Sequence, residues 1–366
     1  MIPLCIPEIR GNEWKYVKEC IDTNWVSSVG SYVTLFEERF SQYVQSKKAV
    51  VTMNGTAAIQ LALIALGIGE GDEVIVPSMT FISPVNAIKY VGAVPVFCDV
   101  RRDTFVMDEE KIEDLITEKT KAILPVHIYG HPVDMDKVME LAKKYNLYVI
   151  EDATEALGSQ YKEKMAGTIG HIGCFSFNGN KLITTGAGGM LVTNDEKLGE
   201  RAKFLSTQTK VVLENKAFYH PEIGYNFRMP NLLAAFGVAQ LEQAEEYLKV
   251  KLENAAYYNE KLKDVKGVTL PVEMSWAKNC FWLYSILIED DYPISRDELI
   301  KKLGENKIES RPFFMPVHDM PPYKECKAGD MKVTEEIAAR GINLPSSASL
   351  TKGQIDIICE VIKNPF

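Results

Sequence analysis

CFSFNGNKLITTGAGGMLVTND, residues 174–195, contains a single lysine, Lys181, between two apolar runs. A Gly-Ala-Gly-Gly turn at residues 186–189 separates this lysine from the second run. Lysine side chains are usually solvated, so Lys181 on its own is compatible with an ordinary loop lysine. The sequence around it tests whether Lys181 instead takes part in chemistry.

The run before Lys181 is one of seven short apolar runs, at 48–53, 73–78, 94–100, 121–127, 146–152, 174–177 and 189–193. Helical patterns lie between them, at residues 56–66 and behind an Asp134 cap at residues 133–145. The apolar face of the second pattern consists of Val138, Leu141, Ala142 and Tyr145. Apolar strands with helical crossovers predict an α/β fold with a mostly parallel seven-stranded sheet between helices.

The pattern changes after the sheet. One long helix is predicted from Pro230, on the apolar positions Leu241, Ala244, Leu248, Leu252, Ala255 and Leu262. Strands at 281–289 and 308–314 then alternate with helices at 295–306, 332–340 and 351–363. We therefore expect a large α/β domain over residues 1–250 and a smaller C-terminal α+β domain over residues 251–366.

Composition excludes several classes of function. The 366 residues carry a formal net charge of −9 and contain no basic run, which argues against nucleic-acid and anionic membrane surfaces. The seven cysteines are scattered and never spaced as CxxC, so we expect reduced thiols and no metal site. Because neither a signal peptide nor a membrane span is recognisable, we expect a cytoplasmic protein.

Polar and aromatic side chains follow the predicted strands, at the edge where doubly wound sheets bind ligands. Gly55 and Thr56 lie at a helix start, which suits a phosphate or forms an ordinary turn with a Thr cap. Phe81 follows the second strand and either stacks on a flat ring or simply packs. Asp152 ends a buried strand, where a carboxylate needs a cationic ring nitrogen or an arginine as partner.

Ser176 adds a hydroxyl donor, and Lys181 follows five residues later. Together these groups supply what pyridoxal phosphate needs: a phosphate cradle, a ring stacker, an aspartate for the pyridine nitrogen and a lysine for the aldehyde. Because an amine reacts only when unprotonated, we expect a crowded, cationic and partly dry pocket to lower the pKa of Lys181.

Three segments resemble a known family: EDATEALGS (151–159), GTIGHIGCFSFNGNKLITTGAGGMLVTND (167–195) and GYNFRMPNLLAAFGVAQL (224–241). They are similar to the DegT/DnrJ/StrS sugar-nucleotide aminotransferases. The resemblance extends over nearly the whole chain. It implies an aspartate-aminotransferase-like fold, pyridoxal 5′-phosphate as cofactor and a homodimer.

By this resemblance, Lys181 bonds covalently to the cofactor and Asp152 pairs with its pyridine nitrogen. The remaining cofactor contacts implied are Gly55, Thr56 and Ser176 at the phosphate, Phe81 on the ring, and Asn226 at the phosphate of the neighbouring subunit. Each active site of the dimer would then be shared between two subunits.

Two positions depart from the family pattern. Ala187 replaces a glutamate that commonly stands between the glycines after the lysine, so any role of that glutamate is absent. Glu155 stands where many members carry His or Gln that donates toward the cofactor, and an ionised carboxylate cannot donate. Some 4-amino-sugar enzymes of the family do carry Glu at this position.

Within the family, residues 23–40 and 311–323 look most like the branch that aminates the C4 ketone of GDP-4-keto-6-deoxymannose to GDP-perosamine, with L-glutamate as donor. Lys181 argues against the family's 3-dehydratases, in which histidine replaces the lysine. The residues expected to line the sugar-nucleotide pocket are Trp25, Ser27, His318 and Tyr323. For Trp25 the alternative is a core anchor, and for His318 a satisfied polar residue of the small domain.

Other functions stay open at this point. An aminotransferase for a UDP- or dTDP-linked 4-keto-6-deoxy sugar shares the same motifs. A non-catalytic regulator on this scaffold would be expected to lose Lys181 or Asp152, and both are present. A dinucleotide-dependent oxidoreductase is disfavoured because no GxGxxG motif follows the first strand.

Overall fold

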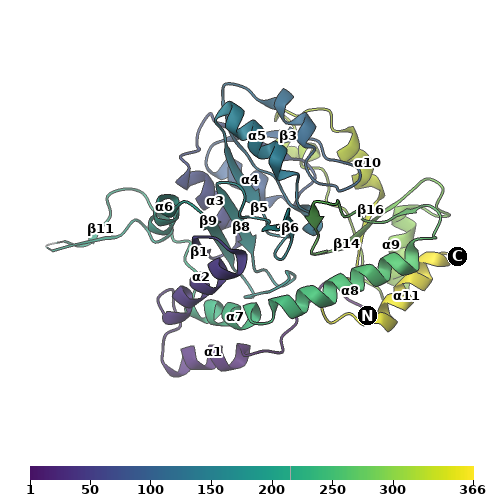
Figure 1. Cartoon of the computed structure of the whole chain (residues 1–366), viewed down its shortest axis with the longest axis horizontal. Helices are drawn as coiled ribbons and strands as arrows, with labels where there is room; N and C mark the ends of the chain where they lie inside the picture. The colour runs from purple at the N-terminus through teal and green to yellow at the C-terminus, as the bar shows by residue number, and fades with distance from the viewer. Residues whose placement is uncertain (215) are drawn as a thin grey trace.

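The computed structural model describes residues 1–214 and 216–366. Its centre is a seven-stranded sheet with the strand order β1-β9-β8-β5-β4-β2-β3 (Figure 1). These strands are β1 (Lys48–Thr52), β2 (Glu73–Pro77), β3 (Val94–Cys98), β4 (Thr120–Ile123), β5 (Tyr148–Asp152), β8 (Ile172–Ser176) and β9 (Gly189–Thr193). Strand β9 runs antiparallel to β1 and β8, and the pairs from β8 to β3 are parallel. The predicted α/β fold is confirmed.

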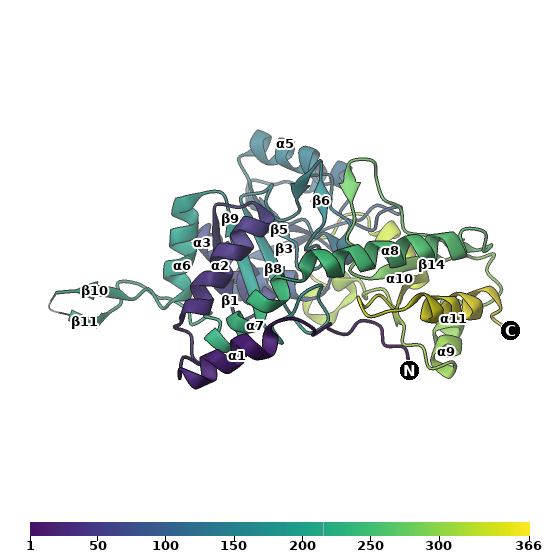
Figure 2. The ribbon, with the colours of Figure 1, turned by 60° about the horizontal axis from the view of Figure 1, so that its bottom comes forward.

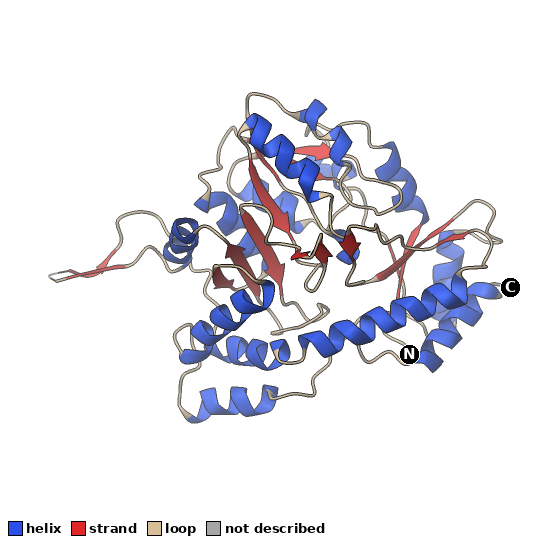
Figure 3. Ribbon diagram, in the orientation of Figure 1, coloured by secondary structure: helices blue, strands red, loops and turns tan. Residues whose placement is uncertain are grey.

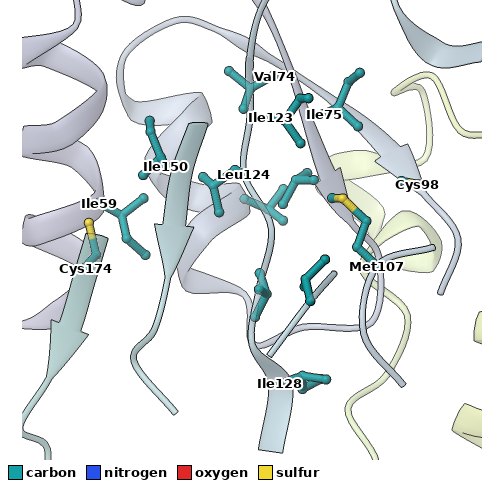
Figure 4. Packing of buried hydrophobic residues seen from close by; sticks show 14 of the residues in the cluster. Ile59, Val74, Ile75, Cys98, Met107, Ile123, Leu124, Ile128, Ile150 and Cys174 are labelled. Atoms are coloured by element: carbon teal, nitrogen blue, oxygen red, sulfur yellow. The ribbon is translucent and has the colours of Figure 1, made fainter. Parts of the chain in front are cut away.

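Helices cover both faces of this sheet (Figure 3). Alternate residues of β8 point to opposite faces, as the two-residue period of a strand requires. Cys174 packs with Ile59 of α3 (Gly55–Ala65) in the main core (Figure 4), whereas Phe175 packs against α2 (Ser31–Val44) and α7 (Asn231–Leu241). The other helices of this region are α1 (Glu13–Asp22), α4 (Ser83–Tyr90), α5 (Met135–Tyr145) and α6 (Glu196–Ser206).

The long helix predicted from Pro230 is wrong, because two helices replace it. Pro230 caps α7, and α8 (Ala244–Leu262) begins after a break at residues 242–243. No glycine or proline marks this break, so the apolar spacing continues through it unchanged. Leu252 and Tyr145, expected on buried faces, are 40% and 38% exposed.

Beyond the sheet, β14 (Tyr284–Ile288) and β16 (Gly341–Leu344) form the centre of a four-stranded antiparallel sheet in the order β12-β14-β16-β15. Its outer strands are only β12 (Val268–Thr269) and β15 (Arg311–Pro312), so the strand predicted at 308–314 is much shorter than expected. The helices α9 (Arg296–Glu305), α10 (Lys332–Arg340) and α11 (Lys352–Lys363) accompany it, and Ser295 caps α9.

The predicted domain division at residue 250 falls inside α8. Ala244 and Tyr247 pack in the core of α2 and α7, whereas Ala255 and Leu262 pack in the core of β14, β16 and α11. The single helix therefore contributes to both cores, and the division itself stays a prediction.

Several elements were not anticipated. They are α1, α2, α4, α6, the three-stranded sheet of β13 (Ala277–Lys278), β6 (Gln160–Tyr161) and β7 (Lys164–Met165), and the pair β10 (Val211–Leu213) and β11 (Lys216–Tyr219). The β10–β11 pair projects away from the body in both views (Figure 2). Over residues 1–214 and 216–366, we find no helix with the length and apolar character needed to span a bilayer.

Candidate active site

A cavity of about 490 Å³ lies at the carboxyl ends of β1, β2, β5 and β8, where residues of the β14–β16 region close it. Its volume is typical of small-molecule and cofactor sites. The sequence-predicted residues that line it are Gly55, Thr56, Phe81, Asp152, Glu155, Ser176 and Lys181. The strand-end positions named from the sequence are thus brought to one place.

The turn sequence after Lys181 folds the chain back into β9. The Phe177 N–H donates to the Gly188 carbonyl at 2.9 Å, and the Thr185 N–H donates to the Phe177 carbonyl at 2.9 Å. Gly186 has φ +80°, a conformation that favours glycine. These contacts close a loop whose only lysine lines the cavity.

Two carboxyl groups accompany Lys181. Its Nζ lies 3.7 Å from Glu155 Oε1. Burial lowers the pKa of Lys181, while Glu155 and Asp152 oppose that change. Burial also raises the pKa of Asp152, and it raises the pKa of Glu155 to about 7. The predicted direction for Lys181 agrees, but the predicted cationic surroundings are wrong, because its charged neighbours are acidic.

Adjacent acids at the end of β5 have different surroundings. Glu151 points into the core, where it bonds to His127 Nε2 at 2.9 Å and accepts from three backbone N–H groups, those of residues 167, 169 and 170. Asp152 lines the cavity, and its Oδ1 accepts from the Thr154 N–H at 3.0 Å. No arginine among the described residues forms an ion pair with Asp152. Glu151 is therefore an internal anchor, and Asp152 is the acid that can meet a ligand.

The start of α3 forms one end of the cavity. Asn54 caps this helix by accepting from the Ala57 N–H at 2.8 Å. A Cβ on Gly55 would lie 2.9 Å from Ser176 Cβ, so only glycine leaves this space open. Helix N-terminal N–H groups with the hydroxyls of Thr56 and Ser176 beside them are the donors that an anion site requires.

The residues present fit pyridoxal phosphate. The anion site at α3, the carboxylate of Asp152 and the amine of Lys181 line the same cavity. Phe81 is 54% exposed there, with Phe314 at 5.8 Å between ring centres. The buried Oδ1 of Asn180, also in the lining, has no hydrogen-bond partner among the described residues.

Other lining residues were missed from the sequence, among them Asn180, Trp282, Arg311, Phe314 and Asn343. Of these residues, Trp282 is the one whose ring directly contacts Lys181, with its centre 3.8 Å from Lys181 Nζ. Except for Asn180, these residues lie more than 100 positions from Lys181, and no local motif links them to it.

Five predicted site residues do not line this cavity. Trp25 and Ser27 are exposed, and their carbonyls accept from Asn231. Asn226 is exposed and accepts from the Arg228 side chain.

His318 and Tyr323, which were expected at the sugar pocket, are also absent from the lining of this cavity. His318 Nδ1 bonds to Ser78 Oγ at 2.7 Å, and its ring lies against Phe97. Tyr323 is 4% exposed, and its hydroxyl donates to Asn86. Both side chains have hydrogen-bond partners within the chain, and Tyr323 is buried whereas His318 is partly exposed. A polar residue satisfied by its own chain was the stated alternative for His318.

The family model of the DegT/DnrJ/EryC1/StrS aminotransferases matches residues 7–363. The chain belongs to this family. Membership confirms the predicted class of activity, a pyridoxal-phosphate-dependent aminotransferase.

Relatives within this family are similar over nearly their full length. The chain is 47% identical to the GDP-perosamine synthase of Escherichia coli O157:H7 over 361 residues, which cover 99% of the chain and 97% of that relative. It is 45% identical to the GDP-perosamine synthase of Caulobacter vibrioides over 356 residues, covering 97% and 95%. A solved GDP-4-keto-6-deoxymannose-3-dehydratase with bound GDP-perosamine matches with a TM-score of 0.93 at 25% identity, covering 99% of this chain and all of that one.

Proposed function

We propose that this aminotransferase moves an amino group from L-glutamate to the C4 ketone of a nucleotide-linked 4-keto-6-deoxyhexose. The observation that carries the proposal is the amine of Lys181 beside Glu155, in one cavity with Asp152 and the start of α3. Pyridoxal phosphate, when bound, supplies an aldehyde for the amino group and a ring that accepts the electrons of a carbanion.

The chain's own residues hold and protonate the reactants. Backbone N–H groups from Gly55 onward, with Thr56 and Ser176, bind the phosphate group. The carboxylate of Asp152 would keep a proton on the ring nitrogen of the cofactor. Lys181 would accept the proton that leaves the substrate carbon bearing the amino group and would return it at the carbon of the cofactor aldehyde, and burial favours the unprotonated amine that accepts it.

The proposed sugar substrate is GDP-4-keto-6-deoxymannose, which makes the product GDP-perosamine. Support comes from the two relatives named GDP-perosamine synthase, which match 97% and 99% of this chain. The alternative is a UDP- or dTDP-linked 4-keto-6-deoxy sugar. Cytoplasmic location stays a prediction.

A second copy of the chain is part of the proposal. Trp25, Ser27 and Asn226 are exposed and absent from the cavity lining of their own chain. Large apolar side chains are also exposed nearby in sequence, with Trp14 at 77% and Val29 at 63%. Such a surface is typical of an interface, so we propose a homodimer in which these residues meet the partner's site.

The test is a side-by-side assay with glutamate and GDP-, UDP- and dTDP-linked 4-keto sugars. We expect the GDP sugar to react fastest, and no turnover with it would overturn the assignment. Borohydride reduction followed by peptide mass spectrometry is expected to place the pyridoxyl label on Lys181. Lys181→Ala is expected to abolish turnover while still binding the amino sugar, whereas Lys197→Ala, an exposed lysine of α6, leaves the rate unchanged.

A further inference from the structure

The ring of Trp282 faces the reacting amine. Lys181 Nζ lies 3.8 Å from the ring centre, and Trp282 is only 5% exposed. The same indole donates from Nε1 to the Asn180 carbonyl at 2.8 Å, so it also contacts the peptide just before the lysine. An ammonium over a ring face is attracted by the ring's negative charge, and among aromatic side chains tryptophan attracts it most strongly.

A buried cation fixes the backbone of this tryptophan. Lys251 on α8 is 5% exposed, and its Nζ donates to the Trp282 carbonyl at 3.1 Å and to the Ser346 carbonyl. Within the described parts of the chain, Lys251 forms no ion pair with a carboxylate. Burial of an ammonium is unfavourable unless polar groups surround it, so these two carbonyls account for its position.

The backbone before Trp282 is held by further contacts. Phe281 has φ +48°, a backbone conformation that residues other than glycine rarely adopt, and its N–H donates to Asn279 Oδ1 at 2.7 Å. Gly130 also packs closely here, since a Cβ on it would lie 2.9 Å from the backbone nitrogen of Trp282. A strained segment persists only where its surroundings determine it, and Lys251 is one of those surroundings.

We propose that Trp282 is a catalytic residue whose ring face holds the Lys181 amino group during proton transfer, and that Lys251 is the positioning residue that orients this ring. The inference rests on the proposed role of Lys181 as proton carrier. The ring favours the ammonium and keeps Nζ at one place in the cavity while the proton is carried. No bond forms or breaks between the two side chains.

The contact is tested by fluorine NMR of the full chain without added cofactor, in which the Lys181 amine is free, with 5-fluorotryptophan at its four tryptophans. Trp282→Phe assigns the Trp282 resonance. We expect this resonance to titrate with pH in the unaltered chain, to lose that step in Lys181→Met, and to stay at its acidic position in Lys181→Arg. Identical titration curves in all three chains would overturn the contact. This measurement needs no turnover, so its failure differs from a failure of the proposed function.

The catalytic role is tested by kinetics. Trp282→Leu is expected to lower kcat about tenfold, with KM for the sugar nucleotide within a factor of about two, since one cation–π contact is lost. The acidic limit of its pH–kcat profile moves to lower pH, because without the ring the unprotonated Lys181 amine that accepts the proton persists to lower pH. Trp282→Phe, which keeps a ring, moves this limit less. The matched control is Trp276→Leu, which removes a tryptophan outside the cavity lining. A fall in thermal stability with an unchanged pH–kcat profile would overturn the proposal.

Lys251 is tested as a positioning residue. Lys251→Met is expected to reproduce the loss of kcat and to move the Trp282 resonance, and Lys251→Arg to restore most of both. Lys261→Met, a change on the same helix, is the control, because Lys261 instead pairs with Asp356 at 2.8 Å. If Lys251→Met folds poorly, Lys251→Arg alone serves as the test. A Trp282 resonance that remains displaced in Lys251→Arg would refute the positioning role of Lys251.

Discussion

Glu155→Gln is expected to stabilise the folded protein at alkaline pH more than at acidic pH. The carboxyl group is 5% exposed, and it meets the Tyr129 N–H at 2.9 Å and Lys181 Nζ at 3.7 Å. Desolvation outweighs both contacts, because the pKa of Glu155 rises from 4.5 to about 7. Glutamine has the same shape and can still accept from the Tyr129 N–H, but it carries no charge to bury.

The size of the effect follows from that pKa. An acid with a raised pKa in the folded state favours folding below its unfolded pKa, and this contribution is lost as pH rises from 4.5 through about 7. At 1.36 kcal/mol per pKa unit, ionised Glu155 lowers the free energy of unfolding by about 3 kcal/mol at pH 8 and about 1 kcal/mol at pH 5. For 366 residues, about 3 kcal/mol corresponds to about 4 °C in Tm.

Differential scanning calorimetry of both chains at pH 5 and pH 8 checks this expectation. The Tm of Glu155→Gln should exceed that of the unaltered chain at pH 8, with a much smaller difference at pH 5. Glu200→Gln, a change at an exposed residue of α6, is the matched control and should not move Tm at either pH. A Glu155→Gln chain that is less stable at pH 8, or equally shifted at both pH values, would refute the reasoning.

Three further changes test the site. Gly55→Ala places a Cβ 2.9 Å from Ser176 Cβ and should weaken cofactor affinity roughly tenfold in an absorbance titration. Gly353→Ala, where a Cβ has no atom within 4 Å, should leave the affinity unchanged, and equal affinities of the two variants would count against the anion site at α3. Asp152→Asn should lower kcat on the order of 100-fold or more without unfolding, and retained turnover would exclude its role. His127→Leu removes one of the four hydrogen bonds to the buried Glu151 and should lower the free energy of unfolding by about 2 kcal/mol in calorimetry. An unchanged Tm would contradict the role of Glu151 as an internal anchor.

The strand-end part of the site was predictable because a local pattern determines it. Buried parallel strands end at one edge of the sheet, so the residues after them converge whatever the rest of the chain does. Gly55, Phe81, Asp152 and Lys181 follow different strands, and all four line the cavity. Periodicity also predicted the strands, but it continued through residues 242–243, where α7 and α8 separate.

The opposite wall of the cavity was not predictable in this way, because it depends on how the second sheet packs against the first. From the sequence Trp282 is simply part of the apolar run 281–289, yet it follows a residue with φ +48° and its ring faces Lys181. Lys251 reads as a polar position on a helix, yet it lies 5% exposed against two backbone carbonyls. Every residue has a backbone carbonyl, so the sequence does not show which carbonyls bind a lysine side chain. A lysine that binds such carbonyls can therefore be distinguished from a solvated lysine only in the tertiary structure.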